Sequence, residues 1–417
     1  MIINILILKS KFTLNVLTLV SGIGVASMFP LVALPVLTRL SSPDNFGIFA
    51  KYMAYVGILG MLSAGRLDMA LILPRKDKDA LGILIIGLAL SFIFFLLLHL
   101  VIFILDQILP IFEFSVEGLY YFVPIGVFLY ASYSMMISWH NRKKNYKLMS
   151  ESRIIQSAII SFIQIFASLV TKLNFSLILA DVVGRLLSII LIIKRSGILE
   201  IEIRKINYIK LLKRYKRFPL VEAPASLINV LSHQMPIIVL PLIFSPAVGG
   251  LYFLTITVTL VPAYLLGTAL LGVFKNKTQE DLKRTGSCST IFIKTGLVLF
   301  SIGAVPTLLL IFFAPTLFTF VFGPEWREAG EYAKILAPLA LIQFVCLPLS
   351  YILILQEKLF LDLIIKIVFL ILVLVVLLLA AELKSIITTV WLLMISGVIY
   401  YLITIFFSYR HSKIKKY

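Results

Sequence analysis

Ionisable side chains interrupt the long apolar runs of this sequence, and they are the residues with which the chain could do chemistry. They are Lys51, Arg66, Asp68, His99, Asp181, Arg185, Glu222, His233, Lys294, Asp362 and Lys366. A charge inside a membrane is costly, so such side chains usually face a cavity or a partner and mark a substrate or ion pathway. The bases outnumber the acids by a single charge, which weakly favours an anionic substrate.

Two acid–base pairs share one spacing, in which the acid stands four residues before the base. They are Asp181 with Arg185 and Asp362 with Lys366. On a helix this arrangement forms an intrahelical ion pair, which lowers the cost of burying both charges. Simple neutralisation explains each pair as well as a functional site does, so both interpretations stay open.

The other charges lack such a neighbour. Arg66 and Asp68 are two residues apart, which places them on nearly opposite sides of a helix. We therefore expect Arg66 to find its partner elsewhere, or to bind an anion. Lys51 lies roughly 60° around the same helix from Arg66 at 3.6 residues per turn, so both could line one cavity wall. Lys294 stands near the start of its run, where it could instead extend to the membrane surface.

One run carries the aromatic residues Tyr130, Tyr133 and Trp139, which could stack on sugar rings, although anchoring at the membrane interface explains Trp139 as well. Two other runs carry polar stripes. One stripe is Glu222, Ser226, Asn229 and His233, in a run that also holds Pro219, Pro224, Pro236 and Pro241; the other is Ser157, Ser161, Gln164 and Ser168. Such faces either hydrogen-bond helices to each other or line a water-filled path. Prolines within a run favour the path, because broken helices are tolerated where they line a cavity or lie buried in protein.

Nothing in the chain resembles a catalytic constellation. It has no glycine-rich nucleotide loop, no metal-ligand cluster and no loop long enough for a Ser/His/Asp arrangement, and Cys288 and Cys346 stand in no paired-ligand spacing. We therefore expect no enzyme, no metal and no cofactor. Alternating access by two helical bundles around a midplane site is the activity that this pattern favours.

The composition indicates a polytopic membrane protein. Hydrophobic residues make up 60% of the chain and charged residues 14%, whereas soluble domains have about 25% charged residues. A spanning helix needs about 20 mainly apolar residues. The apolar runs cover 14–38, 47–73, 81–105, 119–140, 153–172, 174–193, 219–243, 248–274, 289–313, 332–355, 359–381 and 386–408.

The basic residues predict which side of the membrane each loop faces. Most of the 38 Lys and Arg residues fall on the side of the N-terminus, above all in the segment Lys194–Arg217. Because positive charge collects on the cytoplasmic side, both termini and this segment are expected inside the cell. The net charge of +18 therefore fixes topology and meets anionic lipid, and we expect no nucleic acid. The predicted domains are a lobe of residues 1–193, a basic linker 194–218 and a second lobe 219–417.

Within the basic linker, a short amphipathic helix is one interpretation and a flexible charged linker is the other. Ile206, Ile209 and Leu212 recur at helical spacing, while lysines and arginines occupy the remaining positions. The helical interpretation places these three apolar side chains on the inner leaflet of the membrane.

Four blocks of the chain carry a resemblance to a known family. They read LTRLSSPDNFGIFAKYMAYVGILGMLSAGRLDMALILPRKDKDA from Leu37, YKRFPLVEAPASLINVLSHQMPIIVL from Tyr215, VGGLYFLTITVTLVP from Val248 and FGPEWREAGEYAKILAPL from Phe322. Together they resemble the O-antigen flippases (Wzx type) and related polysaccharide exporters of the multidrug/oligosaccharidyl-lipid/polysaccharide superfamily. The blocks lie in both halves and keep their order along nearly the whole chain.

The resemblance implies an all-α polytopic membrane protein, with about twelve spans in two six-helix lobes around a central cavity. It also implies a flippase that moves undecaprenyl-pyrophosphate-linked oligosaccharide across a bacterial inner membrane, for O-antigen lipopolysaccharide or another surface polysaccharide. A polysaccharide polymerase and a chain-length regulator are candidate partners, beside the lipid-linked oligosaccharide and the membrane lipids. The open alternatives are a cation-coupled multidrug exporter of the same superfamily and, from another class, a membrane glycosyltransferase or polymerase. The latter needs larger external loops than this chain offers.

The same resemblance assigns roles to the residues inside the membrane. Arg66 comes first for the pyrophosphate, followed by Lys51 and Arg185, because a guanidinium matches phosphate geometry. Further basic candidates are Lys294 and Lys366. The expected sugar-facing wall is Asn229, His233, Tyr130, Tyr133 and Gln164, and the acids that could couple a proton or sodium gradient are Asp68, Asp181, Glu222 and Asp362.

Overall fold

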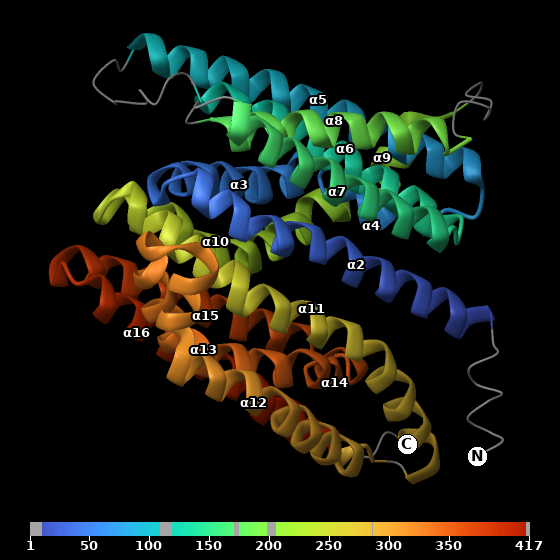
Figure 1. The fold of residues 1–417 in the computed structure, drawn as a ribbon. Coiled ribbons are helices and arrows are strands. Elements are labelled where there is room, and N and C mark those ends of the chain that lie inside the picture. Colours follow the sequence, from blue (N-terminus) through green and yellow to red (C-terminus); the bar gives the residue numbers. More distant parts are fainter. Residues whose placement is uncertain (1–10, 109–118, 171–174, 198–205, 286, 414–417) are drawn as a thin grey trace. The chain divides into compact units, whose positions relative to one another are not determined.

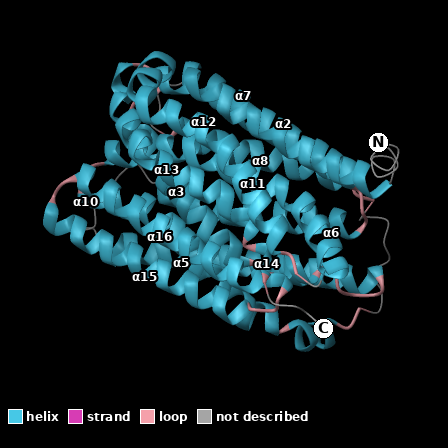
Figure 2. Ribbon diagram, turned by 90° about the horizontal axis from the view of Figure 1, so that it is seen from below, coloured by secondary structure: helices cyan, strands magenta, loops and turns pink. Residues whose placement is uncertain are grey.

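The computed structural model describes residues 11–108, 119–170, 175–197, 206–285 and 287–413 (Figure 1). Throughout these residues the chain forms helices joined by turns and loops, without a strand (Figure 2). Residues 198–205 of the basic segment lie outside the described part.

The helices up to the basic segment follow each other with short connections. They are α2 (Lys11–Leu40), α3 (Pro43–Ser63), α4 (Leu67–Ala70), α5 (Asp77–Ile108), η1 (Leu119–Tyr121), α6 (Phe122–Arg142), α7 (Tyr146–Val170) and α8 (Ser176–Lys194).

The second half begins with a short helix and continues with longer ones. They are α9 (Tyr208–Tyr215), the π-helical turn η3 (Phe218–Glu222), α10 (Ala223–Ile243), α11 (Pro246–Thr285), α12 (Ser289–Phe322), η4 (Pro324–Trp326), α13 (Arg327–Leu349), α14 (Tyr351–Leu355), α15 (Leu359–Leu383) and α16 (Ile386–Ser412).

Twelve helical segments of the described chain are long and apolar enough to cross a membrane. This number confirms the prediction of an all-α protein with twelve spans, and every predicted run overlaps one such segment. Helix α11 continues well past its run and also includes residues 275–284. That stretch is rich in Lys, Gln, Glu and Leu, which are good helix formers, and contains neither glycine nor proline to end the helix.

The packing of the described helices divides the chain into two units. Unit 1 contains residues 1–41 and 51–230, and unit 2 contains residues 42–50 and 231–417. Both α3 and α10 are therefore shared, with one end in each unit. The predicted lobes 1–193 and 219–417 and the linker 194–218 remain predictions, since packing assigns residues to compact bodies and does not define functional lobes.

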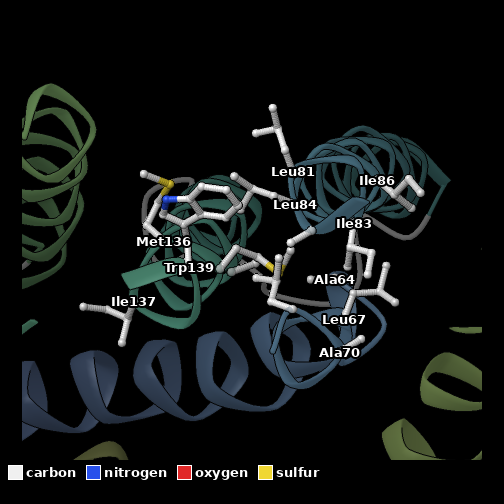
Figure 3. Packing of buried hydrophobic residues seen from close by; sticks show 14 of the residues in the cluster. Ala64, Leu67, Ala70, Leu81, Ile83, Leu84, Ile86, Met136, Ile137 and Trp139 are labelled. Carbon is white, nitrogen blue, oxygen red and sulfur yellow. The ribbon is translucent and has the colours of Figure 1, made fainter. Parts of the chain in front are cut away.

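Helix α6 contributes the largest side chain to the core of unit 1. Trp139 is fully buried in a cluster that also includes Leu84 of α5 and Leu67 of α4 (Figure 3). Burying a large aromatic side chain stabilises a core by several kcal/mol, about 3–5 by the cost of its truncation to alanine. Trp139 therefore serves the core of unit 1, and the expectation that it anchors at the membrane surface or meets a sugar is wrong.

Unit 2 is built around α13, which packs against α11, α12 and α16. The first turn of α3 joins this unit because two glycines permit a very close approach to α11. A Cβ at Gly47 would lie 1.9 Å from the carbonyl oxygen of Pro246, and a Cβ at Gly250 would lie 1.9 Å from that of Pro43. Any side chain at either glycine would force the two helices apart.

Aromatic rings complete this crossing. Phe46 meets the buried ring of Trp326 edge to face with centroids 4.9 Å apart, and Phe49 meets Phe253 in the same way at 6.0 Å. Aromatic pairs prefer this geometry. Three of the four sequence blocks that carry the family resemblance, those beginning at Leu37, Val248 and Phe322, thus meet at one packing site. Helix packing therefore accounts for some of the residues in these blocks.

The short helix α9 confirms that part of the basic linker is helical and shows which side of the helix packs on the protein. Leu211 and Tyr215 are buried in the core cluster of unit 1, whereas Ile209 and Leu212 are 68% and 44% exposed. Ile209 and Leu212 of the predicted stripe thus face away from the protein, as the helical interpretation requires, whereas Ile206 lies before α9 and packs against the core cluster. The side of the helix that packs on the protein is a second apolar stripe, Leu211 and Tyr215.

Candidate functional site

The first acid–base pair lies on α8 inside unit 1. The Nε of Arg185 donates a hydrogen bond of 2.7 Å to Oδ2 of Asp181, and the two side chains are 11% and 2% exposed. The predicted spacing does form an intrahelical ion pair. Burial of both charges makes each of them dependent on the other, because a buried charge without a partner is strongly destabilising.

Helices α3 and α6 complete the surroundings of this pair. The hydroxyl of Tyr52 donates to Oδ2 of Asp181 at 3.1 Å, and the guanidinium of Arg185 lies 5.7 Å from the ring centre of Tyr130. An Nη of Arg185 also approaches the Sδ of Met53 at 3.9 Å. Two neighbouring helices thus contact this pair through polar or polarizable groups, so the pair braces three helices against one another.

The second pair lies on α15 inside unit 2 and is more open. The Nζ of Lys366 donates to Oδ2 of Asp362 at 2.5 Å, so here too the predicted spacing forms an ion pair. The side chains of Lys366 and Asp362 are 29% and 26% exposed. Among the described residues, Lys366 has no other ion-pair or hydrogen-bond partner. This pair can therefore exchange partners with a bound ion or ligand at a lower cost.

Aromatic rings extend along the same face of α15. Phe369 follows Lys366 by one helical turn and stacks on Tyr400 of α16, with ring centres 4.4 Å apart and planes 19° from parallel. On another helix, α10, the imidazole of His233 lies 5.5 Å from the ring of Phe369, and His233 is itself exposed. Tyr400 is within electrostatic reach of Asp362. Charged, hydroxyl, imidazole and aromatic groups thus converge in this part of unit 2, which we call the α15 cluster: His233, Asp362, Lys366, Phe369 and Tyr400.

Gln343 is a residue near this cluster that the sequence analysis missed. It is a buried amide on α13, close to Tyr401, and its Oε1 has no hydrogen-bond partner among the described residues. A buried polar atom without a partner carries a cost, so its presence usually has a reason. The feature of the sequence that could have identified Gln343 is an amide side chain within a hydrophobic span.

Arg66 does not lie within a span. Helix α3 ends at Ser63, and the backbone then adopts the left-handed conformation at Gly65 (φ 59°) and again at Arg66 (φ 55°) before α4 begins. The guanidinium of Arg66 contacts Asp68 at 3.5 Å and the Sδ of Met69 at 3.2 Å. The expectation that Arg66 and Asp68 point to opposite sides is therefore wrong, because the chain is not helical between them.

A second arginine holds the connection that follows this break. The guanidinium of Arg142, at the end of α6, donates to the carbonyl oxygens of Leu71, Ile72 and Pro74 at 2.6–3.4 Å and pairs with Asp77 at 2.9 Å. Arg142 was not among the residues that the sequence singled out. The planar guanidinium of Arg142 can hydrogen-bond several backbone carbonyls at once. It therefore holds the connection between α4 and α5 in position.

The remaining predicted residues occupy separate places in the two units. In unit 1, Lys51, Asn229 and Tyr133 are partly buried, Gln164 is buried on α7, and Glu222, at the end of η3, accepts a hydrogen bond of 3.3 Å from Ser226. In unit 2, Lys294 is exposed near the start of α12 without an ion pair among the described residues. Its environment matches the alternative of a lysine that extends to the membrane surface. No group of His, Cys, Asp and Glu in the described chain could hold a metal ion.

A family model and solved structures place the chain among known proteins. The model described as "Polysaccharide biosynthesis protein" matches residues 36–331, which include parts of both units and all of α3 to α12. Comparison with curated protein sequences gave no match.

Several solved structures with a similar fold are described as transporters. One is described as a MOP superfamily transporter from Pyrococcus furiosus with reversed polarity of its binding pocket; it is 15% identical, with a TM-score of 0.62, over 96% of this chain and 95% of that one. Another is the inward-facing conformation of a multidrug resistance MATE family transporter of the MOP superfamily, 14% identical, with a TM-score of 0.66, over 92% and 93% of the two chains. The outward-facing conformation of such a transporter is 13% identical, with a TM-score of 0.61, over 97% and 95%. At these identities the likeness shows a shared fold.

Proposed function

Because the chain belongs to the family of polysaccharide biosynthesis proteins and has the fold of the MOP superfamily transporters, we propose that it is a lipid-linked oligosaccharide flippase. Its substrate would be an undecaprenyl-pyrophosphate-linked repeat unit, and its site of action a bacterial inner membrane with both termini cytoplasmic. The single observation that supports this proposal most is the family match across residues 36–331.

The chemistry of such a substrate defines what the protein must supply. The sugar and the pyrophosphate cannot enter hydrocarbon, whereas the polyprenyl tail can remain in lipid. Polar and basic side chains inside the transporter would have to replace water around the head group, and the two lobes would alternate in opening to either side. The reaction makes and breaks no covalent bond, so we propose transport without catalysis.

The surroundings of the basic residues change which of them are the strongest candidates to bind pyrophosphate. Arg185 already faces Asp181 and Tyr130, and Arg66 lies after the end of its span beside Asp68. Lys366 is partly exposed, and Lys51 is partly buried with no ion pair among the described residues. We therefore propose Lys366 and Lys51 as the first candidates for the pyrophosphate. Asp362 is the first candidate for coupling to a proton or sodium gradient.

A gene deletion tests the proposed function. We expect the deletion to abolish surface polysaccharide and to cause lipid-linked repeat units to accumulate on the cytoplasmic face of the membrane, with both effects reversed by the wild-type gene. Intact surface polysaccharide without such accumulation would contradict the proposal. A polymerase and a chain-length regulator, as proposed partners, would be sought by cross-linking in the same cells.

A multidrug exporter is the second candidate, because two of the similar structures are described as multidrug resistance transporters. Dye efflux measured in the deletion strain and in the complemented strain separates the two functions. Efflux that depends on this protein, together with unchanged surface polysaccharide, would favour the exporter.

A further inference from the structure

Helix α9 (Tyr208–Tyr215) has two apolar faces, of which the protein covers one. On the covered face, Leu211 and Tyr215 belong to the core cluster of unit 1. Gly82 of α5 allows this contact, since a Cβ there would come within 2.5 Å of the Leu211 side chain. The side chain of Asn207 caps the helix by accepting from the backbone N–H of Lys210 at 3.0 Å. The helix is thus held in place and presents a defined outer face.

The outer face combines apolar and basic side chains. Ile209 and Leu212 are exposed, as are Leu220 and Val221 in the π-helical turn that follows. Exposed cations stand between and beside them: Lys210, Lys213, Arg214, Lys216 and Arg217. In the part of the chain that the structure describes, none of these cations forms an ion pair with a carboxylate. Their charge is available to a partner outside the protein.

The length of the seventh spanning segment places α9 at the membrane surface. The segment Tyr208–Ile243 contains 36 residues, which would extend roughly 54 Å as one continuous helix. The hydrocarbon core needs about 20 residues. If the apolar helix α10 occupies the core, α9 lies at the level of the lipid head groups. Amphipathic helices that bind anionic bilayers lie at this level, with apolar side chains below the head groups and Lys and Arg beside the phosphates.

We propose that α9 and η3 form a binding surface for anionic phospholipid head groups, with Ile209 and Leu212 inserted between lipids and Lys213, Lys216 and Arg217 on their phosphates. A water-soluble acidic partner fits less well, because it would leave these exposed apolar side chains in water. Bilayer surfaces with anionic lipids attract such basic segments by about 1 kcal/mol for each Lys or Arg. The proposal concerns bound lipid, so it does not depend on the transported substrate.

A tryptophan reporter on the outer face tests this surface in the full-length protein. The variant Ile209→Trp is reconstituted in nanodiscs that contain brominated phosphatidylglycerol or brominated phosphatidylcholine at the same mole fraction, and the fluorescence of the wild type is subtracted. We expect stronger quenching by the anionic lipid, and a smaller difference at high salt because screening weakens the attraction. Equal quenching by the two lipids would overturn the proposal.

Two charge-matched triple variants show whether the cations on α9 cause the preference. In the Ile209→Trp background, K213Q/K216Q/R217Q is expected to lower the preference for phosphatidylglycerol at least about fivefold, the factor that corresponds to one lost cation–lipid contact. The control R75Q/K76Q/K147Q removes the same charge at other exposed positions of unit 1 and is expected to keep the preference. An equal loss in both triple variants would indicate a general effect of net charge and contradict a site on α9. Unchanged amide exchange of residues 208–215 in both variants would confirm that the helix stays docked.

Discussion

The two ion pairs of the chain have the same spacing and opposite surroundings. Asp181 and Arg185 in unit 1 are 2% and 11% exposed, and Tyr52 and Tyr130 contact them from other helices. Asp362 and Lys366 in unit 2 are 26% and 29% exposed. Among the described residues, Asp362 is the only ion-pair or hydrogen-bond partner of Lys366. The difference teaches that spacing alone predicts a pair, whereas burial and partners decide whether the pair supports the fold or can act on a ligand.

The chemistry of the two bases strengthens this division. Arg185 is a guanidinium with several N–H groups in a rigid plane, which suits a permanent pair that also stacks on an aromatic ring. Lys366 is a compact ammonium on a flexible stem, so it can turn from one partner to another. We therefore assign the pair in unit 1 to stability and propose the pair in unit 2 for transport.

Arg185→Met gives the largest expected loss of stability. It leaves the carboxylate of Asp181 buried without its cation, which costs about 3–5 kcal/mol. Thermal unfolding of the purified protein, together with its level in the membrane, measures the loss. The double variant Asp181→Leu/Arg185→Met removes both charges and is expected to recover most of the stability. If the double variant is as unstable as the single one, the pair is not a charge-balanced brace.

Tyr52→Phe tests the third member of the same group. It removes the hydroxyl that donates to Asp181 and keeps the ring, so we expect a loss of about 1.5 kcal/mol in unfolding free energy, as for hydrogen bonds to charged groups. Tyr130→Phe is the matched control, because it keeps the ring that faces the Arg185 guanidinium. A loss for Tyr130→Phe as large as that for Tyr52→Phe would argue against a specific contribution of the hydroxyl–carboxylate bond.

Asp362→Asn is expected to cost about 1 kcal/mol or less in stability, because partly exposed pairs contribute little. Transport measured per protein molecule is expected to fall about tenfold, equivalent to about 1.4 kcal/mol. The comparison requires protein levels from immunoblots and surface polysaccharide from the same cells. Normal transport in Asp362→Asn would remove the functional assignment of the α15 cluster.

Lys294→Gln is expected to have the smallest effect. The residue is exposed near the start of α12, and surface substitutions of this kind usually change stability by less than about 0.5 kcal/mol. Unfolding temperature and surface polysaccharide should both match the wild type. A transport defect at normal protein level would return Lys294 to the substrate-binding residues.

Hydropathy and charge spacing predicted the twelve spans and both ion pairs, because these depend on local sequence. They failed at Gly65 and Arg66, where the break requires two successive residues in the left-handed conformation. Glycine is a signal for such a break, but an arginine with positive φ is uncommon. Periodicity also identified only the outer apolar stripe of α9, because the helix has a second stripe, Leu211 and Tyr215, whose packing depends on contacts with distant residues.

Other features depended on contacts between segments far apart in the sequence. The first turn of α3 packs in unit 2 through Pro246 and Trp326, and no local pattern indicates these partners. The family blocks had suggested functional residues, whereas Gly47 and Gly250 in them serve helix packing. The candidate site could thus be predicted as a set of residue types, and the structure was needed to separate the buried pair from the open one.

The most direct test of the proposed flippase is transfer of a fluorescent lipid-linked oligosaccharide across proteoliposomes, read as the fraction cleaved by an impermeant glycosidase. Wild-type protein should expose lipid from the inner leaflet and raise this fraction above that of protein-free liposomes, whereas Asp362→Asn should leave it near the protein-free level. A wild-type fraction equal to that of protein-free liposomes would contradict the flippase itself. Equal transfer by Asp362→Asn and wild type would contradict the role of the pair in unit 2.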